Sequence, residues 1–365
     1  MRVIIDASPL LVRSAGVKNY LYYWIQHLRQ TAGPREIATL PALDLRSSLT
    51  HESSIAGRLR TVRGLATLAL ANYTPLPVMD LAARGADIFH ASVLVRRPPS
   101  RVRLTGTVYD VTCFLMPELH PVANRRADAS FANLARRADG LIAISQCTKD
   151  DAVRVLGLSP EKITVIYPGV ADAFFECPAA EIDMARRHYQ LNRPFVLFVG
   201  TIEPRKNLDT LLDAWEALPV GLREHHDLVI AGPVGWAGER TVTRLTGIRY
   251  LGYVPERHLA PLTAAATAFA YPSLYEGFGF PVAQAMAAGV PVITSNVSSL
   301  PEVAGDAALL VDPRSQSELR SALARVLTSP DLRISMAASG RQSAKRFRWP
   351  ECARRSLEFF RDLLG

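Results

Sequence analysis

Residues 271–291 read Y-P-S-L-Y-E-G-F-G-F-P-V-A-Q-A-M-A-A-G-V-P, which sets an acid and two glycines directly before a run of helix-forming residues. The apolar segment A-T-A-F-A before it predicts a buried strand that ends at Pro272. P-V-A-Q-A-M-A-A predicts a helix, because Pro281 suits its first turn and Gly289 suits the position after its end. The stretch therefore predicts a strand, a loop and a helix, the repeating unit of a parallel α/β fold.

The loop in this stretch has the features of an anion site. Gly277 and Gly279 allow the backbone to approach a ligand closely. The N–H groups of Phe278, Gly279 and Phe280 are expected at the positive end of the helix dipole. The loop therefore predicts an anion-binding site with the carboxylate of Glu276 beside it.

A second stretch, residues 195–215, reads F-V-L-F-V-G-T-I-E-P-R-K-N-L-D-T-L-L-D-A-W. It predicts an apolar strand, a turn at Gly200, the adjacent bases Arg205 and Lys206, and a helix capped near Asn207. A planar guanidinium and a compact ammonium can together grip and neutralise a diphosphate. The alternative is an exposed basic pair, although cations near a helix start oppose the helix dipole. As a surface residue, Lys206 would contribute little to packing.

Both stretches resemble the donor site of retaining family 4 glycosyltransferases, which have the GT-B fold. G-T-I-E-P-R-K-N is similar to the mannosyltransferase members in particular. The resemblance covers nearly all of residues 190–365 and is weaker in the first half, where V-Y-D-V-T-C-F-L-M-P-E-L-H-P carries it. It implies an α/β chain of two Rossmann-like doubly wound domains that face each other across a cleft. It also implies that Arg205, Lys206 and the helix end hold the donor diphosphate, while Glu276 orients the sugar.

The resemblance also implies where the nucleotide base binds. L-V-I-A-G-P, which contains Gly232, and Y-L-G-Y-V-P-E-R-H-L match the strand ends that hold the base in this family. Gly252, Tyr253 and Val254 would line the base, and Leu259 would pack behind it. The alternative for Tyr253 is a plain core aromatic, which on residue type alone is the commoner role.

In the first half, S-A-G-V-K-N-Y-L places Gly16 and Lys18 where the family has a glycine loop against the diphosphate. A turn glycine with a solvated lysine is the alternative. His90 ends the strand segment D-I-F-H, and in this architecture it would face the cleft and bond a sugar hydroxyl. A lone histidine is more often a satisfied structural residue.

Two positions depart from the family pattern. Tyr109 stands in V-Y-D where many relatives have V-H-D, and a tyrosine donates a hydrogen bond without carrying a positive charge. Gln284 stands eight positions after Glu276, where the family usually has a second Glu that binds the ribose. Both departures leave the identity of the donor open, and they also leave open that the protein is a noncatalytic homologue.

Ten apolar runs alternate with helical segments and predict parallel sheets. They are V-I-I-D, D-I-F-H, L-T-G-T-V-Y-D, G-L-I-A-I-S, I-T-V-I-Y, F-V-L-F-V-G, D-L-V-I-A-G, I-R-Y-L-G, A-F-A-Y-P and P-V-I-T-S. Turn residues after Ile166 predict a linker, which divides the chain into an acceptor-side domain, residues 1–168, and a nucleotide-sugar domain with the linker, residues 169–349. The resemblance implies that a final helix, 350–365, packs back on the first domain.

The net charge of +8 lies in the first half, since residues 1–170 hold 21 Lys and Arg against 13 Asp and Glu and the remainder holds 21 of each. Arg58, Arg60 and Arg63 precede the apolar run L-A-T-L-A-L-A-N-Y, which is too short to span a bilayer. This segment indicates either peripheral contact with an anionic membrane or an ordinary surface helix. The basic residues form no recognisable nucleic-acid-binding module, so no nucleic-acid partner is expected.

The start of the sequence lacks the pattern of a signal peptide. The four cysteines of the chain show neither C-x-x-C nor zinc spacing. Both observations indicate a cytoplasmic protein, and peripheral membrane contact would place it at the inner face of the membrane. No metal or other cofactor is expected, because cationic side chains would replace a metal at the diphosphate and no D-x-D cluster is present.

These features predict a retaining transferase that moves a hexose, mannose from GDP-mannose favoured, to a hydroxyl of a glycan or lipid-linked saccharide. Catalysis would rest on position and charge stabilisation. Two alternatives remain open: a GT-B epimerase acting on a UDP-sugar, which requires dedicated acid and base carboxylates, and a noncatalytic sugar-nucleotide-binding homologue.

Overall fold

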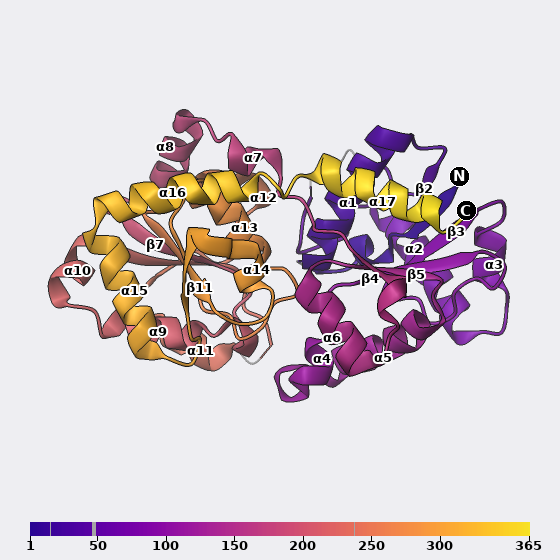
Figure 1. Ribbon diagram of the computed structural model, residues 1–365, viewed down its shortest axis with the longest axis horizontal. Coiled ribbons are helices and arrows are strands. Elements are labelled where there is room, and N and C mark those ends of the chain that lie inside the picture. Colours follow the sequence, from indigo (N-terminus) through magenta and orange to yellow (C-terminus); the bar gives the residue numbers. More distant parts are fainter. Residues whose placement is uncertain (15, 46–48, 237) are drawn as a thin grey trace. The chain divides into compact units, whose positions relative to one another are not determined.

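The computed structural model describes residues 1–14, 16–45, 49–236 and 238–365. The chain divides into two compact units (Figure 1). The first unit is Met1–Gly169 together with Arg348–Gly365, and the second unit is Val170–Phe347. Each unit has its own six-stranded sheet in which neighbouring strands are parallel.

The sheet of the first unit has the strand order β2-β1-β3-β4-β5-β6. Its strands are β1 (Val3–Asp6), β2 (Ile37–Leu40), β3 (Ile88–Ala91), β4 (Arg103–Val108), β5 (Gly140–Ala143) and β6 (Ile163–Val165). Its helices are η1 (Ser8–Leu11), α1 (Gly16–Ala32), α2 (Arg58–Tyr73), α3 (Val78–Ala82), α4 (Thr112–Leu115), η2 (Pro117–Leu119), α5 (Val122–Arg137), α6 (Gln146–Leu156), η3 (Pro160–Lys162) and α17 (Trp349–Asp362). Figure 1 shows α1 and α17 on one face of this sheet and α5 and α6 on the other.

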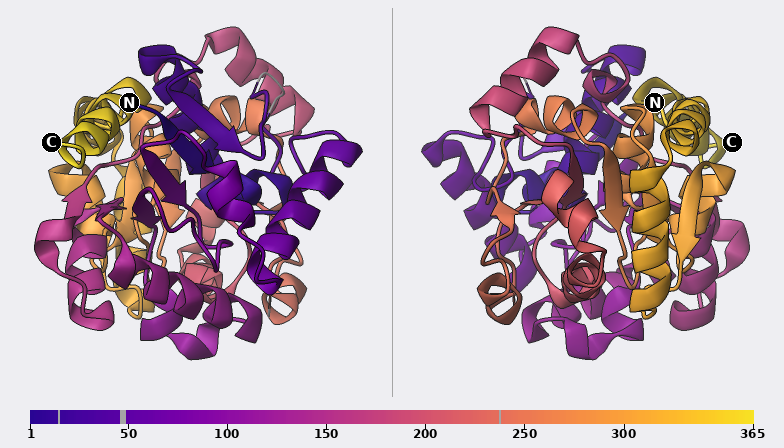
Figure 2. Two further views of the ribbon diagram at one scale, coloured as in Figure 1. Left: turned by 90° about the vertical axis from the view of Figure 1, so that its right-hand side faces the viewer. Right: turned by 90° about the vertical axis from the view of Figure 1, so that its left-hand side faces the viewer.

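The last helix, α17, returns to the first unit and lies along α1 (Figures 1 and 2). Trp24 of α1 donates a hydrogen bond from Nε1 to Ser356 Oγ at 2.9 Å, and its ring lies 6.2 Å from that of Phe360. The apolar residues of α17 recur at helical spacing, so one face of the helix is buried against this unit.

The sheet of the second unit has the strand order β12-β11-β10-β7-β8-β9. Its strands are β7 (Phe195–Val199), β8 (Asp227–Ala231), β9 (Arg249–Tyr250), β10 (Ala268–Tyr271), β11 (Val292–Ser295) and β12 (Ala308–Val311). Its helices are α7 (Asp172–Phe175), α8 (Ala179–His188), η4 (Pro204–Lys206), α9 (Leu208–Glu216), α10 (Val220–His225), α11 (Glu239–Thr243), α12 (Glu256–Ala264), α13 (Phe280–Ala287), α14 (Leu300–Ala304), η5 (Gly305–Ala307), α15 (Gln316–Thr328) and α16 (Pro330–Ala344). In Figure 1, α9 and α15 cover one face of this sheet, and α12, α13 and α16 cover the other.

In each sheet the winding direction reverses at one point. In the second unit the reversal lies between β7 and β10, and in the first it lies between β1 and β3. In open parallel α/β sheets, ligands bind beyond the carboxyl ends of the strands at such a reversal. The fold therefore provides one candidate binding position in each unit.

The parallel α/β class is confirmed, and every one of the ten apolar runs contains a strand. The two strands that the sequence did not predict, β2 and β12, are the edge strands beside β1 and β11. Buried and partly buried residues alternate in β2, and in β12 only Val311 is buried. Thr39 interrupts the apolar residues of β2, whereas β12 reads A-L-L-V and is apolar throughout, although most of it is not buried.

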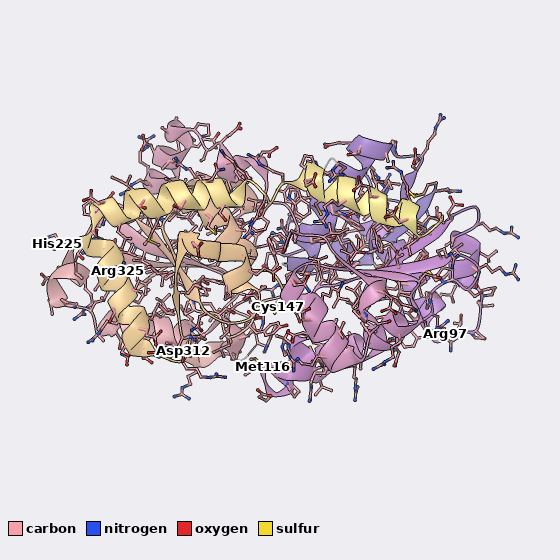
Figure 3. The ribbon with its side chains drawn as sticks, viewed as in Figure 1. Arg97, Met116, Cys147, His225, Asp312 and Arg325 are labelled. Atoms are coloured by element: carbon pink, nitrogen blue, oxygen red, sulfur yellow. The ribbon has the colours of Figure 1, made fainter. Side chains whose placement is uncertain are left out.

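Within the described part of the chain, Cys113, Cys147, Cys177 and Cys352 form no disulfide bond. Cys147, labelled in Figure 3, lies on α6 with its Sγ 3.7 Å from Asp151 Oδ2. The described part of the chain contains no helix that is both long enough and apolar enough to cross a membrane.

Candidate active site

A cluster of charged side chains lies at the reversal point of the second unit, where β7 and β10 end side by side. Arg205 and Lys206 belong to the short helix η4 after β7, and Glu276 belongs to the loop after β10. The two segments are joined through the backbone carbonyl of Arg205, which accepts a hydrogen bond from Leu274 N at 2.9 Å and lies 3.1 Å from Ser273 Oγ. The fold thus brings together two motifs that are far apart in the sequence.

The cluster consists of two cations and two carboxylates. Lys206 Nζ lies 2.6 Å from Glu276 Oε1, and Arg205 Nη1 lies 3.1 Å from Glu276 Oε2. Arg205 Nη2 lies 2.8 Å from Glu203 Oε1. The side chains of Arg205 and Lys206 are each only 12% exposed. The expectation that Lys206 is a surface lysine is therefore wrong, because the carboxylate of Glu276 allows its ammonium to be buried.

Glu276 Oε1 also accepts hydrogen bonds from Tyr271 Oη at 3.0 Å and Ser273 Oγ at 2.7 Å. Burial opposes ionisation of this carboxyl, but the charges of Arg205 and Lys206 outweigh it and lower the pKa of Glu276 to about 2. Glu276 is therefore a carboxylate at neutral pH. It holds both cations in place, and Oε2 faces the guanidinium of Arg205.

Burial and then the neighbouring charge of Arg205 lower the pKa of the Lys206 ammonium, and Glu276 and Glu203 offset part of this effect. The Lys206 ammonium also lies 5.4 Å from the centre of the Tyr271 ring, within the range of a cation–π contact. An anionic ligand beside Lys206 would add a second favourable charge and support the protonated form.

The backbone of Glu276 is held from the other side by the segment before α14. Its N–H donates to Ser298 Oγ at 3.0 Å, and its carbonyl accepts from Ser299 Oγ at 2.8 Å. Ser298 has a φ of 55°, in the left-handed region that residues other than glycine seldom adopt. These two contacts hold the backbone of Glu276 on both sides of its Cα and so fix the point from which the carboxylate extends.

Helix α13 begins as the sequence predicts, with Pro281 in its first turn and Gly289, at a φ of 72°, just after its end. Gly279 precedes the helix with a φ of 94°, and an added Cβ there would lie 2.7 Å from Leu300 Cδ2. This position requires glycine for both conformation and space. Gln284 lies on α13 and is partly buried.

The remaining residues of the glycine loop are largely enclosed. Gly277 and Phe278 are buried, and the Phe278 ring packs at 5.3 Å from Phe280 and 5.1 Å from Phe347. The Phe278 side chain thus serves the core, and any contribution of this residue to ligand binding would come from its backbone.

Three glycines pack against one another at the carboxyl ends of β7 and β8 and after β9. Gly200 N donates to Ala231 O at 2.9 Å, and Gly232 N donates to Gly252 O at 2.7 Å. A Cβ on Gly232 would lie 1.9 Å from the carbonyl oxygen of Gly200. Close backbone packing therefore explains Gly232, whereas Gly252 has a φ of 65° and open space beside it.

The residues after Gly252 differ in exposure. Val254 is buried, while Tyr253 and Leu259 are partly buried. Tyr253 therefore retains a surface on which a ligand could rest, in contrast to a fully buried core aromatic. Val254 is a buried core residue of the second unit.

The structure contradicts the expectation that His90 faces a ligand. His90 is 2% exposed, and its ring nitrogens lie 3.0 Å from Thr105 Oγ1 and 2.9 Å from Thr107 Oγ1. The ring also packs against Trp24 and Phe360 at 4.9 and 5.9 Å. Burial lowers the pKa of His90 to about 3, so the ring is neutral. His90 is a structural residue that fills the space under α1 and α17.

The assignment of Lys18 to the donor diphosphate is also wrong. Its side chain is fully buried, and Nζ donates to the backbone carbonyls of Val12 at 2.8 Å and Ser53 at 2.5 Å. Burial lowers the pKa of Lys18 to about 8. Lys18 therefore ties two loops together, while Gly16 begins α1 and is exposed.

Tyr109 directly follows β4 and is partly buried, with its ring edge-on to Tyr20 at 5.3 Å. Burial raises the pKa of Tyr109 above its ordinary value, so the phenol stays protonated and can donate a hydrogen bond. A hydrogen bond from this phenol to a ligand stays a prediction.

Sequence reasoning missed one member of the charged cluster, Glu203, and the two hydroxyl donors to Glu276, which belong to Tyr271 and Ser273. Glu203 lies in the same E-P-R-K string as the two cations, so its negative charge next to them could have indicated from sequence that it pairs with one of them. Tyr271 and Ser273 look like the end of a buried strand, and only the tertiary structure shows their hydroxyls at Glu276. Within the described residues, no group of three or more His, Cys, Asp and Glu side chains is arranged to hold a metal ion.

Comparison with known proteins identifies both halves of the chain. The family described as Glycosyl transferases group 1 matches residues 181–343, and Glycosyltransferase Family 4 matches residues 15–174. O-antigen chain mannosyltransferase B of Escherichia coli is 34% identical over 267 residues, covering 71% of this chain and 70% of that protein. The serotype-specific mannosyltransferase WbdA of Escherichia coli is 25% identical over 330 residues, covering 84% of this chain but 39% of that longer protein.

Solved structures share the fold over the whole chain. HepE of Anabaena, in complex with UDP and glucose, has a TM-score of 0.75 at 18% identity and covers 99% of this chain and 100% of that one. Sucrose-phosphate synthase of Thermosynechococcus elongatus has a TM-score of 0.75 at 20% identity and covers 100% of this chain and 99% of that one. The fold is therefore GT-B, and the chain belongs to glycosyltransferase family 4.

Proposed function

We propose that this glycosyltransferase is a retaining mannosyltransferase that transfers mannose from GDP-mannose to a hydroxyl of a glycan or lipid-linked saccharide. The supporting observation is the buried cluster of Arg205, Lys206 and Glu276 at the reversal point of the second unit. The similarity to the two mannosyltransferases of Escherichia coli supports mannose as the sugar.

In this proposal the two cations take the charge that develops on the leaving diphosphate. The acceptor oxygen forms its bond to the anomeric carbon on the face from which the phosphate oxygen departs, and that phosphate oxygen takes the acceptor proton. Arg205 and Lys206 are already held by Glu203 and Glu276, so little reorganisation accompanies the charge transfer. They would supply the positive charge without a metal ion or another cofactor.

Glu276 has two roles in the proposal. Its Oε1 holds Lys206, Tyr271 and Ser273, and this network positions the ammonium. Its Oε2, which lies near Arg205, would accept a hydrogen bond from a sugar hydroxyl. A carboxylate with a pKa near 2 also favours the positive charge that develops on the sugar.

Incubation of the purified chain with a panel of GDP- and UDP-sugars tests this function. Slow release of nucleotide from GDP-mannose, and transfer that retains the α configuration by NMR, are the expected results. Conversion of a UDP-sugar to its epimer would support the second hypothesis instead. Tight binding without turnover of any donor, also after a glycan acceptor is added, would indicate the noncatalytic homologue suggested by Gln284 and Tyr109.

We also propose peripheral contact with an anionic membrane through α2, which would place the chain at the cytoplasmic face. Leu59 and Val62 are 74% and 64% exposed, and Tyr73 is 69% exposed. Arg58 precedes Leu59 at the start of the same helix. An exposed apolar stripe next to cations fits a helix that lies on anionic lipid. Co-sedimentation with phosphatidylglycerol vesicles should be lost in Leu59→Asp/Val62→Asp, and equal sedimentation of both proteins would refute the contact.

A further inference from the structure

A pocket of about 300 Å³ in the first unit lies beyond the carboxyl ends of β1 and β2. Ten residues line it: Ser8, Leu40, Pro41, Ala42, Arg60, Arg63, Gly64, Thr67, Leu68 and Met79. None of them belongs to the charged cluster around Glu276. The lining combines two guanidinium groups with a mainly apolar wall, which suits a ligand that is anionic at one part and apolar at another.

One face of α2 forms the wall that carries the charge. Arg60, Arg63, Gly64, Thr67 and Leu68 follow the spacing i, i+3, i+4, i+7 and i+8, which places them on one side of a helix. The exposed Leu59 and Val62 belong to the other side, which makes this pocket distinct from the stripe proposed to touch lipid.

Gly64 brings this face of α2 close to the segment after β2. An added Cβ would lie 2.6 Å from Leu11 Cδ1 and 3.0 Å from Pro41 Cγ. Glycine thus allows the helix to pack against the opposite wall, and the two arginines that precede it line the same pocket.

The positive charge of this pocket is uncompensated. Some arginines of the first unit pair with carboxylates, as in Arg103 with Asp139 at 2.8 Å and Arg154 with Asp151. For Arg60 and Arg63, the described residues provide no carboxylate oxygen within 4.0 Å. Two guanidinium groups on adjacent turns of one helix repel each other, and an anion bound between them would relieve that repulsion.

Ser8 adds a polar group of defined direction. Its Oγ donates to Asp6 Oδ1 at 2.6 Å, and its N–H donates to the same oxygen at 3.1 Å. Asp6 is buried and also bonds Ser92 Oγ, across the β1–β3 reversal point. Because the Ser8 proton is committed to Asp6, its oxygen presents lone pairs and would accept a hydrogen bond from a ligand hydroxyl.

We propose that this pocket binds the phosphate or diphosphate of a lipid-linked acceptor, with Arg60 and Arg63 on the phosphate oxygens. Leu40, Pro41, Leu68 and Met79 would contact the first carbons of the lipid, and Ser8 would accept from a sugar hydroxyl. The position agrees with the rule that ligands bind at the carboxyl edge near a reversal of the sheet. The inference rests on the proposed transferase function and narrows its acceptor to an amphiphilic phosphate.

Calorimetry with geranyl diphosphate and with inorganic pyrophosphate tests the pocket. The unmodified chain should bind geranyl diphosphate more tightly than pyrophosphate, because only the former contacts the apolar wall. Arg60→Ala/Arg63→Ala should weaken both ligands by about tenfold or more, since it removes two charge-assisted contacts. Arg58→Ala, on the same helix but outside the pocket, is the matched control and should change both affinities less than about twofold.

Leu68→Trp should weaken geranyl diphosphate and leave pyrophosphate binding unchanged, because it fills the apolar part of the pocket. Unchanged geranyl diphosphate affinity in a folded Arg60→Ala/Arg63→Ala protein would overturn the proposal, and so would an equal loss in Arg58→Ala. If that double variant loses phosphatidylglycerol vesicles but keeps geranyl diphosphate, the arginines serve the lipid surface and the pocket assignment is wrong. Hydrolysis of GDP-mannose by the unmodified chain is measured separately, so that failure of the transferase function is distinguished from failure of this acceptor site.

Discussion

Replacement of Glu276 by Gln should destabilise the second unit, and the size of the effect should depend on pH. The amide keeps the shape of the side chain and can still accept from Lys206. Its NH₂ group, however, would face Arg205 Nη1, which lies 3.1 Å from Oε2 and is also a donor. The substitution therefore leaves Arg205 and Lys206 close together with only Glu203 to compensate them.

The magnitude follows from the pKa of Glu276, which falls from 4.5 to about 2 on folding. A carboxyl whose pKa is depressed in the folded state contributes stability that is present above its unfolded pKa. That stability is lost as the pH falls through the folded pKa. The depression corresponds to about 3 kcal/mol at pH 7, and about 2 kcal/mol of this should be lost by pH 3. The difference between Glu276→Gln and the unmodified chain should therefore shrink from about 3 to about 1 kcal/mol.

Urea unfolding at pH 7 and pH 3, followed by hydrogen exchange of peptides from β7 and β10, measures this difference in the second unit alone. Glu216→Gln is the matched control, because Glu216 is 62% exposed and lies 3.7 Å from Arg244. Its effect should stay below about 1 kcal/mol at both pH values. A difference for Glu276→Gln that is the same at pH 7 and pH 3 would refute the ionised, buried carboxylate.

Four further substitutions test individual residues. Lys206→Met should lower donor turnover by about a hundredfold or more, and it should also lower stability because the Lys206 side chain is only 12% exposed. Lys345→Met, at an exposed lysine of the same unit, should change neither turnover nor the urea midpoint. Gly232→Ala should destabilise the second unit by more than about 2 kcal/mol, since its Cβ would meet the Gly200 carbonyl; a normal urea midpoint would contradict this. His90→Ala should lower the stability of the first unit by about 2 to 4 kcal/mol without changing donor hydrolysis. Because burial lowers the pKa of His90, the unmodified chain should lose stability as the pH falls below 6.5. Gln284→Glu should change GDP affinity, measured by calorimetry, more than it changes turnover. An unchanged GDP affinity, with stability shifted by less than about 0.5 kcal/mol, would show that Gln284 does not contact the donor.

Local sequence was sufficient for the order of strands and helices around the site. The start of α13 at Phe280, with Pro281 in its first turn, depends on residues that are neighbours in the chain, and so does the turn at Gly200 after β7. These features could be predicted because backbone conformation and helix capping are set within a few residues. The edge strand β2 was missed because Thr39 interrupts its apolar residues, whereas the apolar run A-L-L-V of β12 is too short for its period to distinguish a strand from a helix.

The resemblance of two short motifs was enough to assign the family, and the same sequence also pointed to the principal charged residues, Arg205, Lys206 and Glu276. Only the tertiary structure showed that Lys206 and Glu276, 70 positions apart, form a buried ion pair. It also showed that Lys18 and His90 are buried and satisfied within the first unit. The sequence states which groups can ionise or donate, whereas their burial, partners and pKa values depend on segments that become neighbours only when the sheets assemble.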